Sequence, residues 1–149
     1  MEGQCVDNNG RSFKGRKCAE KMNTEYRYMQ SDMHNLFPAI GAVNALRLNF
    51  NFQMLGENVP NTFGSCPMKI QGRKAEPPVR ARGQIARTYK YMDLTYPRYR
   101  MSDQQRQLMN AWDKMYPVDE WECKRARRIA RIQGNPNPVT ERACAEAGL

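Results

Sequence analysis

The sequence predicts an α+β protein that is mainly helical. Over most of the chain, apolar residues recur three and four positions apart, which is the spacing of amphipathic helices. Apolar and polar residues alternate only around residues 50–54, where we expect a half-buried strand. A chain of 149 residues, 40% of them hydrophobic, can bury one core, and no internal repeat is visible. We therefore expect residues 1–149 to form a single domain.

The N-terminal part is expected to contain an exposed loop followed by one helix. Residues 7–17 are polar and basic and include two glycines, which favours a loop. Residues 19–33 are predicted to form a helix with an apolar stripe, which we interpret as core packing because methionine commonly fills cores. The stripe consists of Met22, Tyr26, Met29 and Met33.

Residues 31–52 are predicted to combine a short helix with the start of the strand. Pro38 suits the first turn of a helix, and Asn35 can supply a nearby cap. Asn44 and Arg47 are three residues apart and share a polar edge of this helix. An amide beside a guanidinium is suited to bind a metal ion and a phosphate group, so both are candidate site residues.

After a short irregular region, the rest of the chain is predicted to be helical. We expect a loop over residues 56–64, a short strand over residues 66–70 and a basic connector over residues 71–76. Two prolines then open a helix over residues 79–96. Its outer side is expected to carry Arg80, Arg82, Arg87 and Lys90.

Three further helices are predicted towards the C-terminus. Ser102 and Gln105 form a capping box for the first, Pro117 starts the second and Gly134 ends it. Residues 137–144 form the last. The apolar face of the first of these helices is expected to comprise Leu108, Met109, Trp112 and Met115.

The chain is strongly basic. Lys and Arg outnumber Asp and Glu by 24 to 15, which gives a formal net charge of +9. This balance favours a polyanionic partner, nucleic acid before membrane, because no apolar run is long enough to span a membrane. Charge alone leaves open a ribosome-like or merely soluble basic protein. The densest basic patch, where we expect sequence-independent phosphate contacts, comprises Arg73, Lys74, Arg80, Arg82 and Arg87.

Five cysteines are an odd number, and none lies in a CxxC pair, which disfavours zinc. Cys5 and Cys18 flank a polar loop, and we predict a disulfide between them. One of the other three is expected to stay unpaired, with Cys66 and Cys144 as the candidates that lack a partner. The odd count and the lack of a signal-peptide pattern together suggest an exported protein without its beginning.

Several longer motifs resemble one known family. SDMHNLFPAIGAVN, with FKGRKCAEK before it and AEPPVRARGQIARTY and NAWDKMYPVDEWEC after it, is similar to bacterial endonuclease I. This is the DNA/RNA-nonspecific nuclease of the His-Me finger superfamily, and the resemblance runs from Gln4 to Cys144. It implies a His-Me finger (ββα-metal) domain that lacks its N-terminal part. It also implies Mg²⁺ as cofactor, action on DNA and RNA by a monomer, and a periplasmic or secreted location.

The resemblance also implies roles for individual residues. Asn44 matches the metal-binding asparagine of the family, and Arg16 best matches the arginine that holds the scissile phosphate. The family's general base and second metal ligand form a Glu-His dipeptide on a preceding strand. No Glu-His dipeptide occurs in this sequence, and the matching segment would lie ahead of Cys5. His34 does not match the catalytic histidine, and we interpret it as structural.

The residues around Asn44 depart from the usual family pattern EVNGDRSN. Arg47 and Asn49 are kept, but two acidic residues are lost, which alters the groups available to support a metal. The replacements are Ala42, Ala45, Leu46 and Leu48. The resemblance as a whole still implies a Mg²⁺-dependent, sequence-nonspecific endonuclease. The alternative is a nucleic-acid-binding fragment without catalysis, and a purely structural module is disfavoured by the charge and the matched residues.

Overall fold

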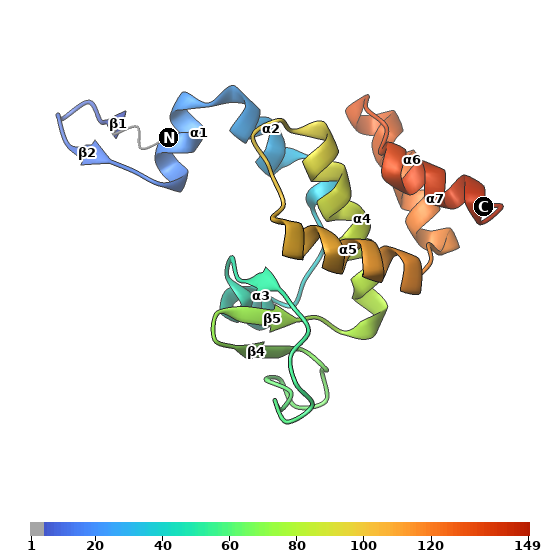
Figure 1. Ribbon diagram of the computed structural model, residues 1–149. Coiled ribbons are helices and arrows are strands. Elements are labelled where there is room, and N and C mark those ends of the chain that lie inside the picture. The colour runs from blue at the N-terminus through green and yellow to red at the C-terminus, as the bar shows by residue number, and fades with distance from the viewer. Residues whose placement is uncertain (1–4) are drawn as a thin grey trace. The chain divides into compact units, whose positions relative to one another are not determined.

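The computed structural model describes residues 5–149, which divide into two compact units (Figure 1). One unit ends at Leu36 and the other covers Phe37–Leu149. The elements of the first unit are β1 (Cys5–Val6), β2 (Ser12–Phe13), α1 (Arg16–Met22), α2 (Thr24–Ser31) and the 3-10 helix η1 (Met33–Asn35).

A small antiparallel hairpin opens the first unit, where a loop was expected. Cys5 pairs with Phe13 across β1 and β2. The Asp7 carboxylate builds the turn, because its Oδ1 accepts the backbone N–H groups of Asn9 and Arg11, each at 2.9 Å. A disulfide between Cys5 and Cys18 then ties β1 to α1, which confirms that predicted pairing.

The expected helix over residues 19–33 is interrupted at Asn23. The Asn23 side chain accepts the backbone N–H of Tyr26 at 3.0 Å and so caps a new helix, α2. The methionine stripe is therefore not core packing: Met22 is 72% exposed and α2 has no buried residue. The helix break caused by the Asn23 cap was therefore stronger than the apolar spacing that had predicted one continuous helix.

The second unit combines a small sheet with the longer helices. Its elements are α3 (Gly41–Arg47), β3 (Asn51–Phe52), β4 (Lys69–Gln71), β5 (Lys74–Glu76), α4 (Val79–Thr95), α5 (Asp103–Met115), α6 (Glu120–Gln133) and α7 (Pro138–Glu146). The strand order is β3-β5-β4, with β5 parallel to β3 and antiparallel to β4. Figure 1 shows α3 beside this sheet and α4 leading from β5 into the helical part.

Local geometry differs from the expectation at three places around the sheet. Helix α3 begins at Gly41 rather than near Pro38, and Ile40 is an exposed N-cap. The expected strand over residues 50–54 is reduced to β3. The basic connector is instead the turn and second strand of a hairpin, because Gly72 and Arg73 both adopt positive φ, +56° and +61°.

The main core lies between α4 and α5. Ala86 on α4 packs with Met109 and Trp112 on α5, and Phe52 from β3 contacts the same cluster. The Ser102 hydroxyl accepts the backbone N–H of Gln105 at 3.2 Å, which confirms the Ser102 half of the predicted capping box, while the Gln105 amide donates to the Phe52 carbonyl at 3.4 Å. Met115 is 64% exposed and does not belong to the apolar face.

Helices α6 and α7 pack against each other, and α7 also contacts α4. Asp119 caps α6, which begins three residues later than Pro117, and Gly134 ends it at φ +85° as predicted. A disulfide joins Cys123 to Cys144, so Cys144 is not the unpaired cysteine. Cys66 is the free cysteine among residues 5–149. Within that range, no helix is both long and apolar enough to cross a membrane.

Candidate metal and nucleic-acid site

Helix α3 presents Asn44 to solvent. The Asn44 backbone N–H donates to the Ile40 carbonyl at 3.0 Å, and its own carbonyl accepts the N–H of Leu48 at 3.2 Å, so the residue is held within one regular turn. Leu48 adopts φ +50°, which ends the helix directly after Arg47. The Asn44 amide is thus an exposed oxygen donor on a short helix, and Mg²⁺ accepts such neutral oxygens while keeping several waters.

Arg47 points from the same helix into an aromatic cluster. Its guanidinium lies 4.4 Å from the centre of the Phe52 ring and donates to the Tyr89 hydroxyl at 3.4 Å. Its Nε–H is buried and has no hydrogen-bond partner within the described chain. The Tyr89 ring meets Phe52 and Tyr99 edge to face. Arg47 therefore anchors α3 to β3 through a cation–π contact and to α4 through a hydrogen bond.

The cluster changes the acidity of its two tyrosines. Burial raises the pKa of the Tyr89 hydroxyl, and the positive charge of Arg47 offsets part of that rise. Burial, together with the neighbouring Tyr89, raises the pKa of Tyr99 further. Both hydroxyls stay protonated at neutral pH, so neither tyrosine supplies a base beside Asn44.

Three of the basic residues predicted to contact phosphates are available at the surface of the hairpin and the start of α4. Arg73 is exposed at the β4–β5 turn and Arg80 is exposed in the first turn of α4. Lys74, on β5, is half-buried. β5 leads through two prolines into α4, so one continuous stretch of chain carries all three.

Arg82 does not lie on the outer side of α4, contrary to the expectation. It is 8% exposed, and its guanidinium donates to Glu76 Oε1 at 2.6 Å and to the Pro77 carbonyl at 3.3 Å. The guanidinium also lies 5.6 Å from the centre of the Trp112 ring. Glu76 in turn accepts the backbone N–H of Leu55 at 2.7 Å. Arg82 therefore fastens β5 to the helical core.

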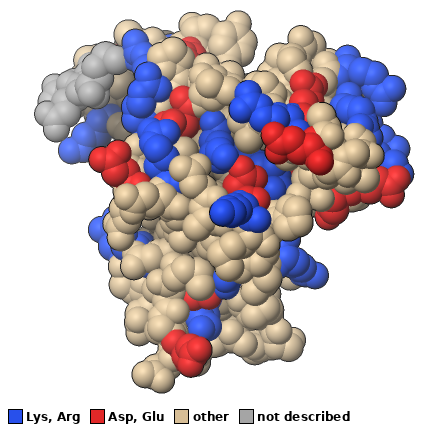
Figure 2. All heavy atoms as spheres, turned by 45° about the vertical axis from the view of Figure 1, so that its right-hand side comes forward, with Lys and Arg blue, Asp and Glu red and all other residues tan. Residues whose placement is uncertain are grey.

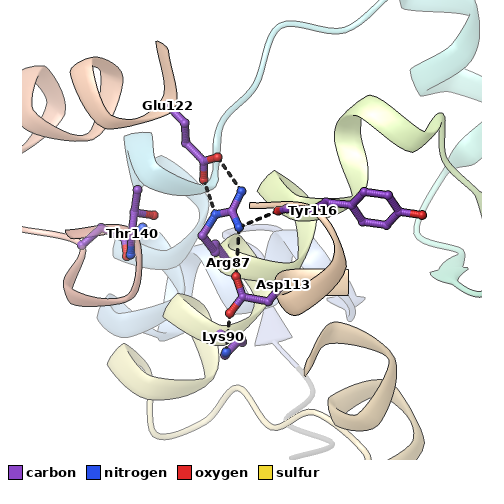
Figure 3. Close-up of polar contacts among 7 residues, drawn as sticks. Arg87, Lys90, Asp113, Tyr116, Glu122 and Thr140 are labelled. Atoms are coloured by element: carbon purple, nitrogen blue, oxygen red, sulfur yellow. Dashed lines mark hydrogen bonds and ion pairs between the residues drawn. The ribbon is translucent and has the colours of Figure 1, made fainter. Parts of the chain in front are cut away.

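Arg87 is also buried, at 2% exposure, and is excluded as a phosphate contact (Figure 3). Its guanidinium forms a two-point pair with Glu122, at 2.7 Å for each nitrogen, and a third contact with Asp113 at 2.9 Å. It also donates to the Tyr116 carbonyl at 3.0 Å. Burial alone would lower the pKa of Arg87, but the two carboxylates outweigh that effect and raise it. Lys90 completes the network by pairing with Asp113 at 2.6 Å.

The sequence did contain a signal for this inward face of α4. Gly83 lies between Arg82 and Ala86, and a Cβ there would sit 2.3 Å from the Tyr116 carbonyl oxygen. A glycine in the middle of a helix has a cost of about 1 kcal/mol relative to alanine, so it indicates close packing on its own side. Arg82 and Arg87 flank that side, and this placement marks them as inward-facing.

In the first unit, Arg16 is the first residue of α1 and its side chain is 74% exposed. The guanidinium makes one weak surface pair with Glu20, at 3.4 Å, and is otherwise directed to solvent. Gly15 precedes it with φ +73°, which turns the chain sharply into the helix. The Cys5–Cys18 disulfide holds this helix start next to the hairpin.

His34 occupies a buried position in η1, with 2% exposure. Its backbone N–H donates to Asp32 Oδ1 at 2.9 Å, and Asp32 is equally buried. A general base must reach a solvent water and a phosphate, and burial withholds the imidazole from both. His34 is thus placed as a structural residue would be.

Metal-ligating side chains are sparse. The part of the chain that the structure describes holds no group of three or more His, Cys, Asp or Glu residues that could bind a metal ion. Asn44 offers one suitable oxygen, and the remaining positions around a Mg²⁺ ion would have to come from water, phosphate or further protein ligands. The donor chemistry therefore fits one protein ligand to Mg²⁺.

Comparisons with known proteins assign the family. The profile described as Endonuclease I matches residues 10–144. An extracellular deoxyribonuclease of Aeromonas hydrophila is 46% identical over 144 residues, which cover 95% of this chain and 59% of that protein. A periplasmic deoxyribonuclease of the same organism is 44% identical, with 95% and 57% covered. Endonuclease-1 of Buchnera aphidicola subsp. Acyrthosiphon pisum is 44% identical, with 87% and 51% covered.

This basic, mainly helical protein therefore belongs to the endonuclease I family, as the motif resemblance implied. The chain spans somewhat more than half the length of the curated relatives it matches.

Proposed function

We propose that this chain is part of a Mg²⁺-dependent, sequence-nonspecific endonuclease that hydrolyses phosphodiester bonds in DNA, and in RNA as well. The observation that carries the proposal is the exposed Asn44 amide on α3, the residue that the motif resemblance equates with a metal-binding asparagine of the family. The deoxyribonuclease names of two relatives support DNA as the substrate. The net charge of +9 suits a polyanion.

Each proposed role follows from the chemistry of the residue. The Asn44 carbonyl oxygen would be one ligand to Mg²⁺, which supplies charge stabilisation at the phosphate when bound. The exposed Arg16 guanidinium would hold the scissile phosphate through two parallel hydrogen bonds. Arg47 would orient α3, and thereby Asn44, through its contacts with Phe52 and Tyr89. The exposed Arg73 and Arg80, with Lys74, would contact the backbone of the substrate.

We further propose that residues 1–149 form one endonuclease I-like domain of the His-Me finger type. Helix α3 would be the helix of its ββα-metal motif. The motif resemblance supports this assignment, and α3 exposes Asn44 as a ligand-bearing helix must.

A second candidate function is nucleic-acid binding without catalysis. The 149 residues contain no Glu-His dipeptide, and the lone histidine is buried. A chain with Asn44 but no general base would still bind nucleic acid through its exposed basic residues. The two candidate functions both predict binding to nucleic acid, so only a measurement of cleavage activity separates them.

The test compares plasmid cleavage by this chain and by an extended chain that carries a Glu-His strand ahead of Cys5. In the extended chain, Asn44→Ala should abolish most cleavage and Arg16→Ala should reduce it. Asn49→Ala is the matched control, because Asn49 is an exposed amide directly after α3. Equal losses for Asn44→Ala and Asn49→Ala would contradict the metal-ligand role.

A location outside the cytoplasm is also proposed. Two relatives are named extracellular and periplasmic deoxyribonucleases. Two disulfides in one small protein fit an oxidising compartment. We propose that the protein works there as a monomer.

A further inference from the structure

Helix α6 carries a basic face that the proposed site does not use. It consists of Lys124, Arg127, Arg128 and Arg131, all of them exposed. At 3.6 residues per turn, these four positions fall within an arc of about 100°. Figure 2 shows Lys and Arg side chains grouped at the right of the view, where Figure 1 places α6. We call these four residues the α6 basic face.

The α6 basic face borders an open depression of about 480 Å³. Besides the four basic residues, only Ala130 and Glu141 line it. One carboxylate thus faces four cations, which leaves a net positive concavity. Such a surface attracts an anion with several charges in a row more strongly than a single small anion.

The face has an energetic cost in the free protein. Lys124 and Arg128 are four residues apart, as are Arg127 and Arg131, and like charges at that spacing destabilise a helix by about 0.2–0.5 kcal/mol per pair. Lys124 is relieved by Glu120 at 2.7 Å. Arg128 and Arg131 have no ion pair within residues 5–149. The helix dipole favours only Arg131, in the last turn.

The opposite side of α6 keeps the helix in place despite this repulsion. Glu122 is held by the buried Arg87, and Cys123 is bonded to Cys144. The basic face is therefore fixed on a rigid support and available to a ligand. A polyanion laid along it would remove the repulsion between its members.

We propose that the α6 basic face is a second phosphate-binding surface, which takes the backbone of duplex nucleic acid. This inference rests on the proposed function and adds a contact region to it. From Lys124 to Arg131 the helix rises about 10 Å over seven residue steps, which matches about three phosphate-to-phosphate steps of one strand at about 3.4 Å of axial rise each. The face offers cations and little else, so binding is independent of base sequence.

The test measures affinity for a 30-base-pair DNA duplex by fluorescence anisotropy in EDTA, over a series of salt concentrations. Arg127→Gln/Arg128→Gln/Arg131→Gln should reduce the slope of log K against log salt by about 2–3, at about 0.9 per phosphate contact. The matched control is Arg11→Gln/Arg98→Gln/Lys114→Gln. It removes the same charge from exposed residues at three separate places, two loops and α5, and its slope should change by less than one.

Two further measurements test the same surface and do not need the triple variant. Glu141→Gln removes the one carboxylate in the depression and should raise affinity several-fold. Trp121, 54% exposed in the first turn of α6, should lose fluorescence on binding, whereas Trp112 is 2% exposed and should not respond. Trp121→Phe identifies the source of the signal.

The inference would be overturned if the slope of log K against log salt fell equally in the triple variant and in its control. An unchanged affinity in Glu141→Gln would overturn it as well. Those results leave the proposed function standing if the wild-type chain still binds DNA with a steep salt dependence. A wild-type chain that binds DNA without any salt dependence would overturn both.

Discussion

At the scale of single residues, Arg87 is a buried side chain that links three helices of the second unit. It joins α4 to Asp113 on α5 and to Glu122 on α6, and it is 2% exposed (Figure 3). Arg87→Met would leave the buried Glu122 carboxylate without its ion-pair partner, whereas Asp113 keeps its pair with Lys90. We expect the free energy of unfolding to fall by about 3–5 kcal/mol, measured by urea denaturation.

The matched control for Arg87 is Lys124→Met. Its pair with Glu120 has the same length as the Arg87–Glu122 pair, 2.7 Å, but both side chains are more than half exposed. Exposed pairs contribute about 0–1 kcal/mol, so this variant should unfold close to the wild type. If both variants lost a similar free energy of unfolding, burial of the Arg87 network would make no measurable contribution to stability.

Asp93 should contribute to the loss of stability in acid. Burial would raise the pKa of its carboxyl, but the N–H of Met101 and the guanidinium of Arg106, which donate at 2.9 and 2.5 Å, outweigh it and lower the pKa. A pKa lowered on folding gives stability that is present above the unfolded value, about 3.9, and is lost as pH falls through the folded value.

Asp93→Asn should therefore flatten the fall in stability below about pH 4 and lower stability at neutral pH. Thermal unfolding at a series of pH values measures both effects. Glu57→Gln, which changes an exposed loop carboxyl, is the control. An acid branch that is equally steep in Asp93→Asn and in the wild type would contradict the role of this carboxylate.

At the scale of elements, the approach of α4 to the end of α5 depends on Gly83. A Cβ at this position would meet the Tyr116 carbonyl oxygen at 2.3 Å and the Arg87 guanidinium at 2.8 Å. Gly83→Ala should separate the two helices and lower the melting temperature, at a cost of about 1–3 kcal/mol. Gly41→Ala in α3 meets no atom within 4 Å and should be neutral or stabilising. A stabilised Gly83→Ala would show that the contact can relax freely.

Some helix boundaries were predictable from local residues. Ser102 and Asn137 cap the starts of α5 and α7 with their side chains, and Gly134 ends α6 in the left-handed conformation. Periodicity alone was less informative: it missed the break at Asn23 and assigned Arg82 and Arg87 to the outer side of α4. An arginine has a long apolar stem and can face the core when a carboxylate pairs with its guanidinium. Here those carboxylates lie on other elements. Glu76 and Glu122 are six and thirty-five positions away from their arginines, beyond the reach of a local pattern.

At the scale of the whole molecule, the family and the mainly helical α+β class were predictable, because long motifs and amphipathic periods extend over most of the chain. The contents of the site were predictable only in part. Asn44 and Arg16 are exposed, as candidates for ligand contact must be. The roles of Arg47, Arg82 and Arg87 depend on aromatic rings and carboxylates brought from distant elements, which the spacing of residues along one helix does not reveal.

The central proposal is that this chain carries one metal ligand of an endonuclease site, Asn44, whereas the general base and the second ligand belong to a Glu-His dipeptide that these 149 residues do not contain. General-base catalysis contributes about 10²–10⁴-fold to rate. The most direct test is the initial rate of supercoiled plasmid cleavage in Mg²⁺, compared between the 149-residue chain and the extended chain with a Glu-His strand. We expect the extended chain to be faster by about 10²–10⁴-fold, and Asn44→Ala to remove most of that rate. Equal rates for the two chains, with His34→Ala inactive, would contradict the claim and make His34 the catalytic base.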